Sequence, residues 1–391
     1  MVKKVVRGFY SVAYSVKLCR PKVICAYPIT PQTEIVERLA EMYANGELEG
    51  CKYITAESEF GAASILVGAS ATGARTFTAT CSQGLMLMSE VLWNAAGMRL
   101  PIVIVNTNRS VSAPLSIWND HQDSLALRDA GIMQMYVENN QEVHDAIPQA
   151  FKIAENRKVL LPFMVCMDGY KLTHAYEPVD LLDQELVDQF LPEFDPPMKL
   201  TTKNPLTFGS YTPPSYHMEF RIAMHRAMER AKDVMLKVFK EWAEITGRDW
   251  GGLITPEYDS GEVSVITLGS LVGMVREVVK ELRNEGYSVN FIKLRVFRPF
   301  PTEDLRKTLE QSSKVIVFEK SISLGHEGPV GMEVKSCIFG KQVEFYDFVV
   351  GLGGRDYPKD AIRKAILDVY EGKRKPGLYF DGYKEFEEIS L

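Results

Sequence analysis

Hydrophobic and polar positions in the first half of the chain follow the pattern of buried strands joined to amphipathic helices. Residues 21–29 are a β-branched apolar run, as expected of a strand inside a sheet, and residues 76–84 and 100–108 contain two further predicted strands. Apolar residues at helical spacing follow the first run, and an apolar helix is expected over residues 85–97 after the second. This alternation predicts a doubly wound α/β domain with a parallel sheet.

The pattern changes after a further predicted strand at residues 160–170. Residues 176–217 are acidic and rich in proline, which predicts an extended arm that wraps a surface. Apolar residues then recur at spacings of three and four, so residues 217–247 should form one long amphipathic helix. Arms of this kind commonly connect subunits.

A second series of strands and helices begins near residue 263. A strand at 263–270, a helix at 272–286 and a strand at 289–297 predict another α/β unit. Glycines between residues 251 and 261 mark the break. We therefore expect one domain over residues 1–255, including the arm and the long helix, and a second domain over residues 256–391.

The composition narrows the classes of function. The chain has 391 residues, 46% of them hydrophobic, which is enough for two or three domains with substantial cores. Its formal net charge of −6 and the absence of a basic stripe argue against nucleic acid as a partner. No apolar run has the length of a membrane span, and the first twenty residues lack a leader pattern, so we expect a cytoplasmic protein with no membrane partner.

Cysteine and histidine spacing does not predict a metal site in this chain. The six cysteines contain no C-x-x-C pair, and the six histidines contain no H-E-x-x-H motif. Scattered cysteines of this kind are typical of small buried residues in a reducing compartment. Metal ions and iron–sulfur clusters are therefore not expected to be bound by this chain.

The join between the first strand and its helix reads AYPITPQTEI, residues 26–35. Thr30 occupies the expected N-cap, Pro31 suits the first turn, and Glu34 lies where the helix dipole favours an acid. A helix N-terminus with free N–H groups and a hydroxyl also suits a bound carboxylate. Ordinary capping explains the same residues, so the pattern leaves both interpretations open.

Two further segments carry candidate chemistry. In AESEFGAAS, Ser58 is expected to cap a helix between Glu57 and Glu59, and a charge–dipole contact would explain the acids. The loop after the strand at 100–108 is dense in polar residues, namely Arg109, Asn119, Asp120, His121, Gln122 and Asp123. Open α/β sheets bind ligands at such loops, and a guanidinium grips a carboxylate in a bidentate manner. A solvated loop in which Arg109 pairs with a neighbouring Asp is the alternative.

Several long segments resemble a known family. They are YPITPQTEI, ESEFGAASILVGASATGARTFTATCSQGLMLMSEVLWNAAGMRLPIV, NRSVSAPLSIWNDHQDSLALRDAG and the later GLGGRD. They resemble the alpha subunit of multi-subunit pyruvate:ferredoxin oxidoreductase (pyruvate synthase) and its 2-oxoacid:ferredoxin oxidoreductase relatives. The similarity spans nearly the whole chain, and the motifs occur in the family's order.

The resemblance implies a fold and a set of site residues. The amino-terminal domain would be the pyrimidine-binding half of a thiamine diphosphate site, and the second domain would be similar to the transketolase C-terminal domain. Glu59 matches the carboxylate that hydrogen-bonds N1′ of the aminopyrimidine and promotes the tautomer that takes the C2 proton. Thr30 and Arg109 match positions that hold the substrate carboxylate. The remaining expected site residues are Pro28 and Ile29 at the cofactor, and Asn119, Asp120 and Gln122 as neighbours in the loop.

The resemblance also implies a reaction and partners. The family decarboxylates pyruvate oxidatively and reversibly to acetyl-CoA and CO2, with coenzyme A as cosubstrate and electrons passed to external ferredoxin. This chain lacks the G-D-G…N pattern that holds Mg2+ and the diphosphate, and it lacks the cysteine spacing for [4Fe-4S] clusters. A beta subunit would supply the diphosphate-binding half with a cluster, and gamma and delta subunits would supply ferredoxin-like domains.

Two alternative functions stay open. The first is the same chemistry on branched-chain, aryl or other 2-oxo acids, against which the loop SAPLSIWNDHQDS looks closer to the pyruvate type. The second is a scaffold subunit without catalysis, which has no need of Thr30, Glu59 and Arg109 together. In the second domain, Arg295 and Arg298 are expected either to face an anion or to close an ion pair.

Overall fold

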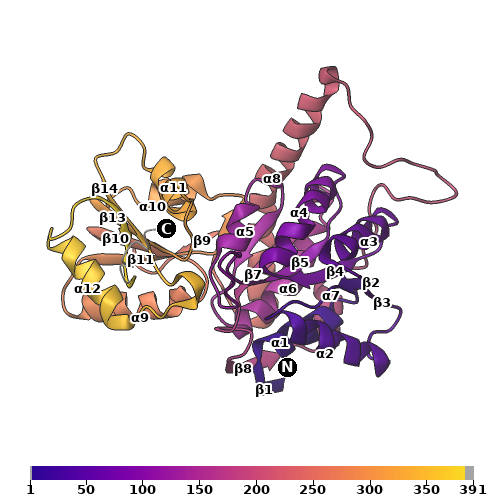
Figure 1. Ribbon diagram of the computed structural model, residues 1–391, viewed down its shortest axis with the longest axis horizontal. Coiled ribbons are helices and arrows are strands. Elements are labelled where there is room, and N and C mark those ends of the chain that lie inside the picture. Colours follow the sequence, from indigo (N-terminus) through magenta and orange to yellow (C-terminus); the bar gives the residue numbers. More distant parts are fainter. Residues whose placement is uncertain (1, 384–391) are drawn as a thin grey trace, which may run out of the picture.

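The computed structural model describes residues 2–383, which form two α/β domains packed side by side (Figure 1). The larger domain is built on a seven-stranded sheet. In spatial order its strands are β12 (Val296–Arg298), β6 (Met133–Tyr136), β7 (Phe163–Asp168), β5 (Val103–Asn108), β4 (Thr76–Thr80), β2 (Val23–Ala26) and β3 (Lys52–Thr55). Neighbouring strands are parallel, except that β12 runs antiparallel to β6. The predicted doubly wound α/β fold is confirmed.

Helices cover both faces of this sheet because successive strand residues point to opposite sides. In β5, Val103 and Val105 belong to one apolar core and Ile104 to the other. The first core is closed by α1 (Gly8–Leu18), α2 (Thr33–Ala44) and α6 (Asn140–Ala154). The second is closed by α3 (Glu59–Ala71), α4 (Ser82–Gly97) and α5 (Gln122–Ala126).

The smaller domain contains a six-stranded sheet. Its spatial order is β15 (Gly377–Phe380), β14 (Glu344–Val349), β13 (Lys314–Glu319), β10 (Val263–Thr267), β11 (Val289–Leu294) and β9 (Ile254–Pro256), with only β9 antiparallel. One face is covered by α9 (Leu271–Asn284) and α12 (Lys359–Tyr370), and the other by α10 (Thr302–Thr308) and α11 (Pro329–Cys337). The core under α10 and α11 is continuous with the core under α3 and α4, so both domains share it.

The chain crosses between the domains more than once. After β11 it returns to the larger domain as β12, and the short β9 on the edge of the smaller sheet contains the predicted boundary at residue 255. The division of the chain into domains at residues 1–255 and 256–391 therefore stays a prediction. In the structure, β12 lies in the sheet of the larger domain although it follows the predicted boundary. A short 3-10 turn, Leu352–Gly354, follows β14.

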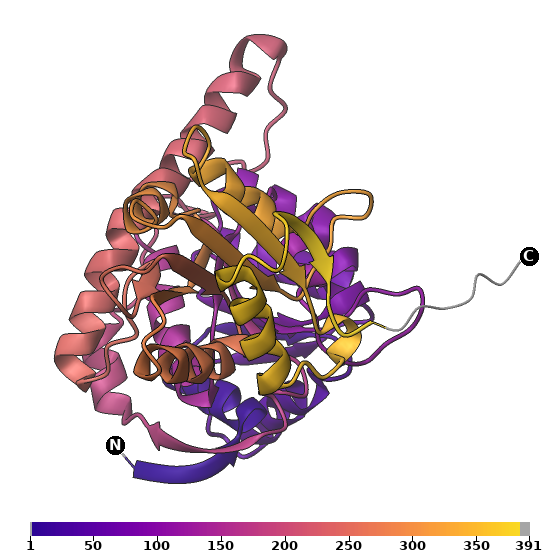
Figure 2. The ribbon, with the colours of Figure 1, turned by 90° about the vertical axis from the view of Figure 1, so that its left-hand side faces the viewer.

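The proline-rich segment combines regular and irregular structure. Strand β8 (Tyr176–Leu181) pairs antiparallel with β1 (Val2–Arg7), and the short helix α7 (Gln184–Phe190) follows. Residues 191–213 are irregular, and the expected long helix is present as α8 (Pro214–Thr246). The carboxyl-terminal part of α8 packs on the larger domain, whereas its first turns are exposed and project from the body (Figures 1 and 2). Among residues 2–383, no helix combines the length and apolarity that a membrane crossing requires.

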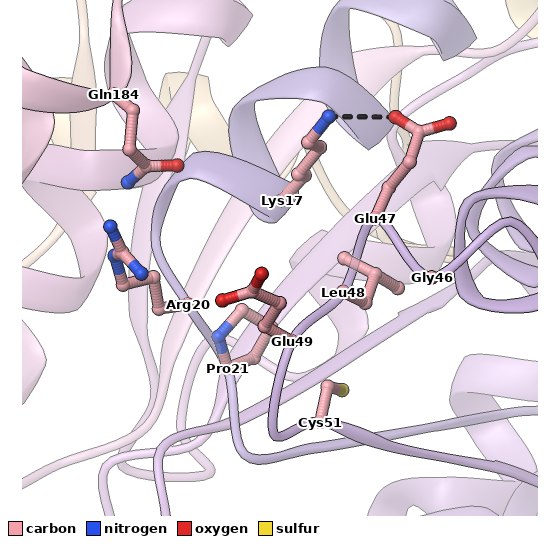
Figure 3. A pocket seen from close by; sticks show the side chains of 9 residues that line it. All are labelled: Lys17, Arg20, Pro21, Gly46, Glu47, Leu48, Glu49, Cys51 and Gln184. Atoms are coloured by element: carbon pink, nitrogen blue, oxygen red, sulfur yellow. Dashed lines mark hydrogen bonds and ion pairs between the residues drawn. The ribbon is translucent and has the colours of Figure 1, made fainter.

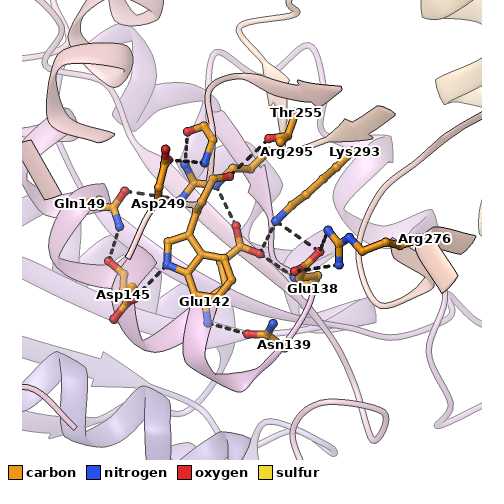
Figure 4. Close-up of polar contacts among 12 residues, drawn as sticks. Glu138, Asn139, Glu142, Asp145, Gln149, Asp249, Thr255, Arg276, Lys293 and Arg295 are labelled. Atoms are coloured by element: carbon orange, nitrogen blue, oxygen red, sulfur yellow. Dashed lines mark hydrogen bonds and ion pairs between the residues drawn. The ribbon is translucent and has the colours of Figure 1, made fainter. Parts of the chain in front are cut away.

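A group of buried and half-buried charges, here called the seam cluster, joins the two domains. It consists of Glu138, Glu142, Arg276, Lys293 and Arg295. The Glu142 carboxylate lies 2.8 Å from both Lys293 Nζ and Arg295 Nε, and Arg276 pairs with Glu138 (Figure 4). Burial alone would raise the pKa of Glu142, but Lys293 and Arg295 hold it below its ordinary value. In this cluster, acids of the larger domain pair with basic residues from the second half of the chain, and these ion pairs hold the two domains together.

Of the two expectations for the arginines of the smaller domain, the ion pair is the one observed. Arg295 pairs with Glu142 as described, and Arg298 pairs with Glu333 in the middle of α11. Both guanidiniums also lie over aromatic rings, of Phe239 for Arg295 and of Phe297 for Arg298.

Candidate functional site

Glu59 lies at the start of α3, where the sequence predicts it. The hydroxyl of Ser58 accepts a hydrogen bond from the Gly61 N–H at 3.1 Å, so the predicted N-cap is confirmed. Glu59 is the first helical residue and only 7% exposed. Its side chain forms no hydrogen bond or ion pair with any residue between 2 and 383. The carboxylate is therefore largely buried, keeps some contact with solvent, and has its hydrogen-bonding capacity available for a group from outside the chain.

Gly84, in the first turn of α4, makes the space that the Glu59 carboxylate occupies. A Cβ atom at this position would lie 2.6 Å from Glu59 Oε1 and 2.6 Å from Thr80 Oγ1. Any other residue would push the carboxylate out of its place. The amino-terminal ends of α3 and α4 therefore converge on one acid group at the carboxyl edge of β4, where open α/β sheets bind ligands.

Arg109 follows β5 at the same edge of the sheet and is 6% exposed. Its Nη1 donates to the backbone carbonyl of Thr30 at 2.7 Å, and its Nη2 lies 3.4 Å from Gln83 Oε1. The Cys81 thiol donates to the same Thr30 carbonyl at 3.2 Å. Thr30 and Arg109, predicted together from motif matches, are thus in direct contact.

The prediction that Thr30 caps the helix is wrong. Helix α2 begins at Thr33 with Gln32 in the N-cap position. The Ile29 N–H donates to Gln32 Oε1 at 3.1 Å and the Gln32 N–H to the Ile29 carbonyl at 2.7 Å, so these residues form a separate turn before the helix. The Gln32 amide also donates to the Ala79 carbonyl at 2.7 Å, which anchors this turn to β4. Thr30 is consequently exposed on the turn, not engaged by α2.

Pro28 and Ile29 lie on the same turn between β2 and α2. Pro28 is exposed and Ile29 is half-buried. Their predicted contact with a cofactor is therefore compatible with their exposure, and it stays a prediction.

The three predicted loop neighbours hold the loop in place. Asn119 donates to Asp168 at 2.9 Å. Asp120 accepts from the Ser110 hydroxyl at 2.7 Å and from the Gly353 N–H at 3.1 Å in the smaller domain. The Gln122 side chain accepts from the Ile322 N–H at 3.2 Å, also in the smaller domain. These contacts lock the loop between the domains, and a direct role for the three residues toward a ligand stays a prediction.

Asp168 is the centre of a polar group at this domain junction. Its carboxylate lies 2.7 Å from His121 Nε2 and 2.6 Å from Lys320 Nζ, and it accepts from the Ser270 hydroxyl at 2.5 Å. Burial alone would raise the pKa of Asp168, but Lys320 and His121 hold it well below its ordinary value. The junction beside the site is thus ionic and fully buried.

Aromatic side chains lie beside Thr30 and Arg109, and sequence reasoning missed them. The rings of Trp118 and Tyr170 are 4.6 Å apart, and Tyr170 stacks on His174 at 4.6 Å. A Cβ atom at Gly169, next to Tyr170, would lie 2.7 Å from Pro31, which places this group against the turn that carries Thr30. The aromatic residue in the polar loop, Trp118, was the signal available in the sequence.

An open cavity of about 260 Å³ lies at another place, beside the carboxyl end of α1 (Figure 3). Its two basic lining residues are paired, because Lys17 lies 2.6 Å from Glu47 and Arg20 lies 2.6 Å from Asp188, and the remaining acid, Glu49, is exposed. The cavity therefore contains no buried acid comparable to Glu59. Across residues 2–383, no group of three or more His, Cys, Asp or Glu side chains is arranged to hold a metal ion.

The fold and this geometry define a class: a two-domain α/β protein with a candidate ligand site at the carboxyl edge of its larger sheet. Solved structures that share the fold include the following two. One is the 2-oxoglutarate:ferredoxin oxidoreductase from Magnetococcus marinus, with a TM-score of 0.75 at 20% identity over 94% of this chain and 65% of that chain. The other is a split-gene transketolase, with a TM-score of 0.53 at 12% identity over 93% of this chain and 98% of that chain.

Family models match both domains. Residues 14–240 match the thiamine-diphosphate-binding domain of pyruvate flavodoxin/ferredoxin oxidoreductase, and residues 261–362 match core domain II of pyruvate:ferredoxin oxidoreductase. The chain belongs to the pyruvate flavodoxin/ferredoxin oxidoreductase family. The resemblance seen in the motifs, and with it the assignment to an oxidoreductase family, is confirmed.

Relatives with different named substrates are about equally similar to this chain. The pyruvate synthase subunit PorA of Methanosarcina barkeri is 49% identical over 93% of this chain and 91% of the relative, and that of Pyrococcus furiosus is 44% identical over 96% and 95%. The ketoisovalerate oxidoreductase subunit VorA of Pyrococcus horikoshii is 46% identical over 94% of both. Overall identity does not separate these two substrate classes.

Proposed function

We propose that this chain is the alpha subunit of a pyruvate:ferredoxin oxidoreductase and contributes the aminopyrimidine half of a thiamine diphosphate site. The complex would convert pyruvate and coenzyme A reversibly to acetyl-CoA and CO2, with electrons passed to ferredoxin. The observation that carries this proposal is the buried Glu59 carboxylate, which has no partner among residues 2–383 and faces the gap kept open by Gly84.

The residues present fit the aminopyrimidine. Its ring nitrogen N1′ offers the external partner that Glu59 lacks, and a carboxylate at that atom can hold or accept a proton. Gly84 leaves the acid room to stay in place. When bound, thiamine diphosphate supplies the carbon nucleophile for the 2-oxo group. The part assigned to this chain is to orient the ring and to control the proton at N1′.

Arg109 and Thr30 are suited to hold the carboxylate of a 2-oxo acid. The guanidinium is not saturated, since Nη2 has only a long contact with Gln83 and Nε has no partner within the described part of the chain. Thr30 is exposed and adds a hydroxyl next to it. A charge-assisted contact of this kind fixes the acid and leaves its reacting carbonyl free.

Other subunits complete the proposed enzyme. A beta subunit would hold Mg2+ and the diphosphate, because the G-D-G…N pattern is missing here. The [4Fe-4S] clusters would lie in partner subunits, among them the beta subunit, and gamma and delta subunits with ferredoxin-like domains would complete the complex. The second candidate function is the same reaction on branched-chain 2-oxo acids, which the ketoisovalerate oxidoreductase relatives favour. A scaffold role is opposed by the Glu59 and Arg109 arrangement, since unpaired buried charges serve no purpose in a scaffold.

The test is to purify the complex that contains this chain and to assay it with pyruvate, 2-oxoisovalerate, 2-oxoglutarate and an aryl 2-oxo acid. Each assay contains coenzyme A and a viologen acceptor. We expect the highest kcat/KM with pyruvate, and no turnover by the isolated chain. Preference for 2-oxoisovalerate would support the second candidate, and inactivity of the complex with all four acids would reject both.

A further inference from the structure

Asp123, in the short helix α5, is a buried carboxylate for which neither the motifs nor the chemistry above provides a role. It is fully buried, and every contact of its side chain is with an N–H donor. The donors are the backbone N–H groups of Ser82 at 2.8 Å, Arg109 at 3.1 Å and Ser124 at 2.8 Å, and the side-chain amides of Asn106 at 3.0 Å and Asn108 at 2.8 Å. Five donors from three segments therefore meet at one acid.

These donors come from both halves of the candidate site. Ser82 is the first residue of α4, and the same turn carries Gly84, against which the Glu59 carboxylate lies. Arg109 is the residue proposed to hold the substrate carboxylate. The Asp123 carboxylate thus holds the backbone at Ser82, beside Glu59, and the backbone at Arg109.

The backbone at Ser82 indicates that this anchor holds an unfavourable conformation. Ser82 has φ 50°, in the left-handed region that non-glycine residues rarely adopt. Such a conformation persists only where surrounding contacts impose it. The contacts here are the Ser82 N–H to Asp123 and the Ser82 hydroxyl to the Ser110 carbonyl.

The five N–H donors around Asp123 favour its ionised form. Burial raises its pKa above the ordinary value, and the N–H donors of Ser82, Asn106 and Arg109 act against that rise. A carboxylate accepts hydrogen bonds at both oxygens, whereas an amide would turn an N–H group toward other donors. An uncharged isostere therefore cannot satisfy all five donors.

We propose that Asp123 is a positioning residue that sets the arrangement of Arg109 relative to the first turn of α4 and to Glu59. This inference rests on the proposed roles of Glu59 and Arg109. Asp123 touches no ligand; it acts by holding the Arg109 backbone and the α4 turn to one point. Loss of its charge should weaken binding of the 2-oxo acid more than it lowers the stability of the fold.

The experiment uses the whole complex with Asp123→Asn and Asp123→Ala. The matched control is Asp145→Asn, because Asp145 is also a fully buried carboxylate, on α6, and pairs with Arg248 away from the site. KM for the 2-oxo acid, the dissociation constant of thiamine diphosphate and hydrogen exchange at the Ser82 and Arg109 amides are measured for each variant. If Asp123→Ala does not fold, Asp123→Asn decides the question.

We expect Asp123→Asn to raise KM by about tenfold or more, the effect of losing hydrogen bonds to a charge. Hydrogen exchange at the Ser82 and Arg109 amides should accelerate in the same variant and stay unchanged in Asp145→Asn. Equal KM values for the two variants, or unchanged exchange at both amides in Asp123→Asn, would overturn the positioning role. Inactivity of the wild-type complex with every 2-oxo acid would instead overturn the proposed function, so the two failures are distinguishable.

Discussion

The seam cluster and the candidate site are both groups of buried charges, but their charges are paired differently. In the seam cluster, Glu142 lies between Lys293 and Arg295, so each buried charge faces an opposite charge from the same chain. In the site, Glu59 has no partner between residues 2 and 383, and Arg109 contacts only backbone and amide oxygens. Because the carboxylate and the guanidinium keep unused hydrogen-bonding capacity at the sheet edge, this region is suited to a ligand. The pairing of buried charges thus separates a structural cluster from a functional one.

The sharpest test of this comparison is Glu59→Gln in the assembled complex. We expect turnover, and the rate of C2 proton exchange on bound thiamine diphosphate, to fall about 10²- to 10⁴-fold, the usual contribution of a positioned acid or base. The free energy of unfolding should stay the same or rise slightly, because no partner inside the chain is lost. Glu57→Gln, an exposed carboxylate two residues away, is the control. A proton-exchange rate equal to wild type would remove Glu59 from its role.

The opposite result is expected at the seam. Glu142→Gln should lower the free energy of unfolding by about 3–5 kcal/mol, because Lys293 and Arg295 would be left buried without their counter-charge. Chemical denaturation measures the loss, and kcat of the folded fraction should be nearly unchanged. A loss below about 1 kcal/mol would show that the seam behaves like a surface ion pair.

An intermediate effect is expected for Arg109→Ala. It should lower kcat/KM for the 2-oxo acid by a factor that corresponds to about 1.5–3 kcal/mol of lost transition-state stabilisation, because a charge-assisted contact is removed. The affinity for thiamine diphosphate should change little. Steady-state kinetics and cofactor titration test both statements. Arg20→Ala, which removes an exposed guanidinium paired with Asp188, serves as the control. Unchanged kinetics with every 2-oxo acid would contradict the carboxylate assignment.

A third buried pair, Glu319 on β13 and Asp347 on β14, brings two acids together at the start of α11. Glu319 accepts the Val330 N–H at 3.1 Å and the Gly331 N–H at 2.6 Å, and Asp347 accepts the Gly328 N–H at 2.8 Å. Burial raises the pKa of Glu319 well above its ordinary value and that of Asp347 to about 6. Two negative charges this close repel each other, so the Glu319 and Asp347 carboxyl groups are favoured to share one proton.

The sign of the resulting pH dependence follows from those raised pKa values. The folded state binds a proton at this pair more tightly than the unfolded state does, so the contribution of the pair to stability is full at low pH and is lost as pH rises from about 4 through about 6. Asp347→Asn should remove part of this fall and be more stable than wild type at pH 8 by on the order of 1 kcal/mol. Denaturation curves at pH 4, 6 and 8 measure it. An equal fall in the free energy of unfolding with pH in wild type and in Asp347→Asn would exclude the shared proton.

Local features of the site were predictable from the sequence, and distant contacts were not. The Ser58 cap and the position of Glu59 in the first turn of α3 depend on neighbouring residues, and both were predicted. The capping role of Thr30 was predicted wrongly, because the Gln32 side chain closes a turn with Ile29 and anchors to Ala79, a residue far along the chain. No local propensity reports such a contact.

The sequence by itself determined the order of strands and helices, the parallel fold class and the family, because hydrophobic periodicity and long motifs are local properties of the chain. The tertiary structure alone decided which charges are paired. It brought Arg109 to the Thr30 carbonyl, returned β12 to the larger sheet and gathered the donors from Ser82 and Arg109 around Asp123. These contacts join residues far apart in sequence, and only the packing of the sheet edge and the two domains brings them within hydrogen-bonding distance.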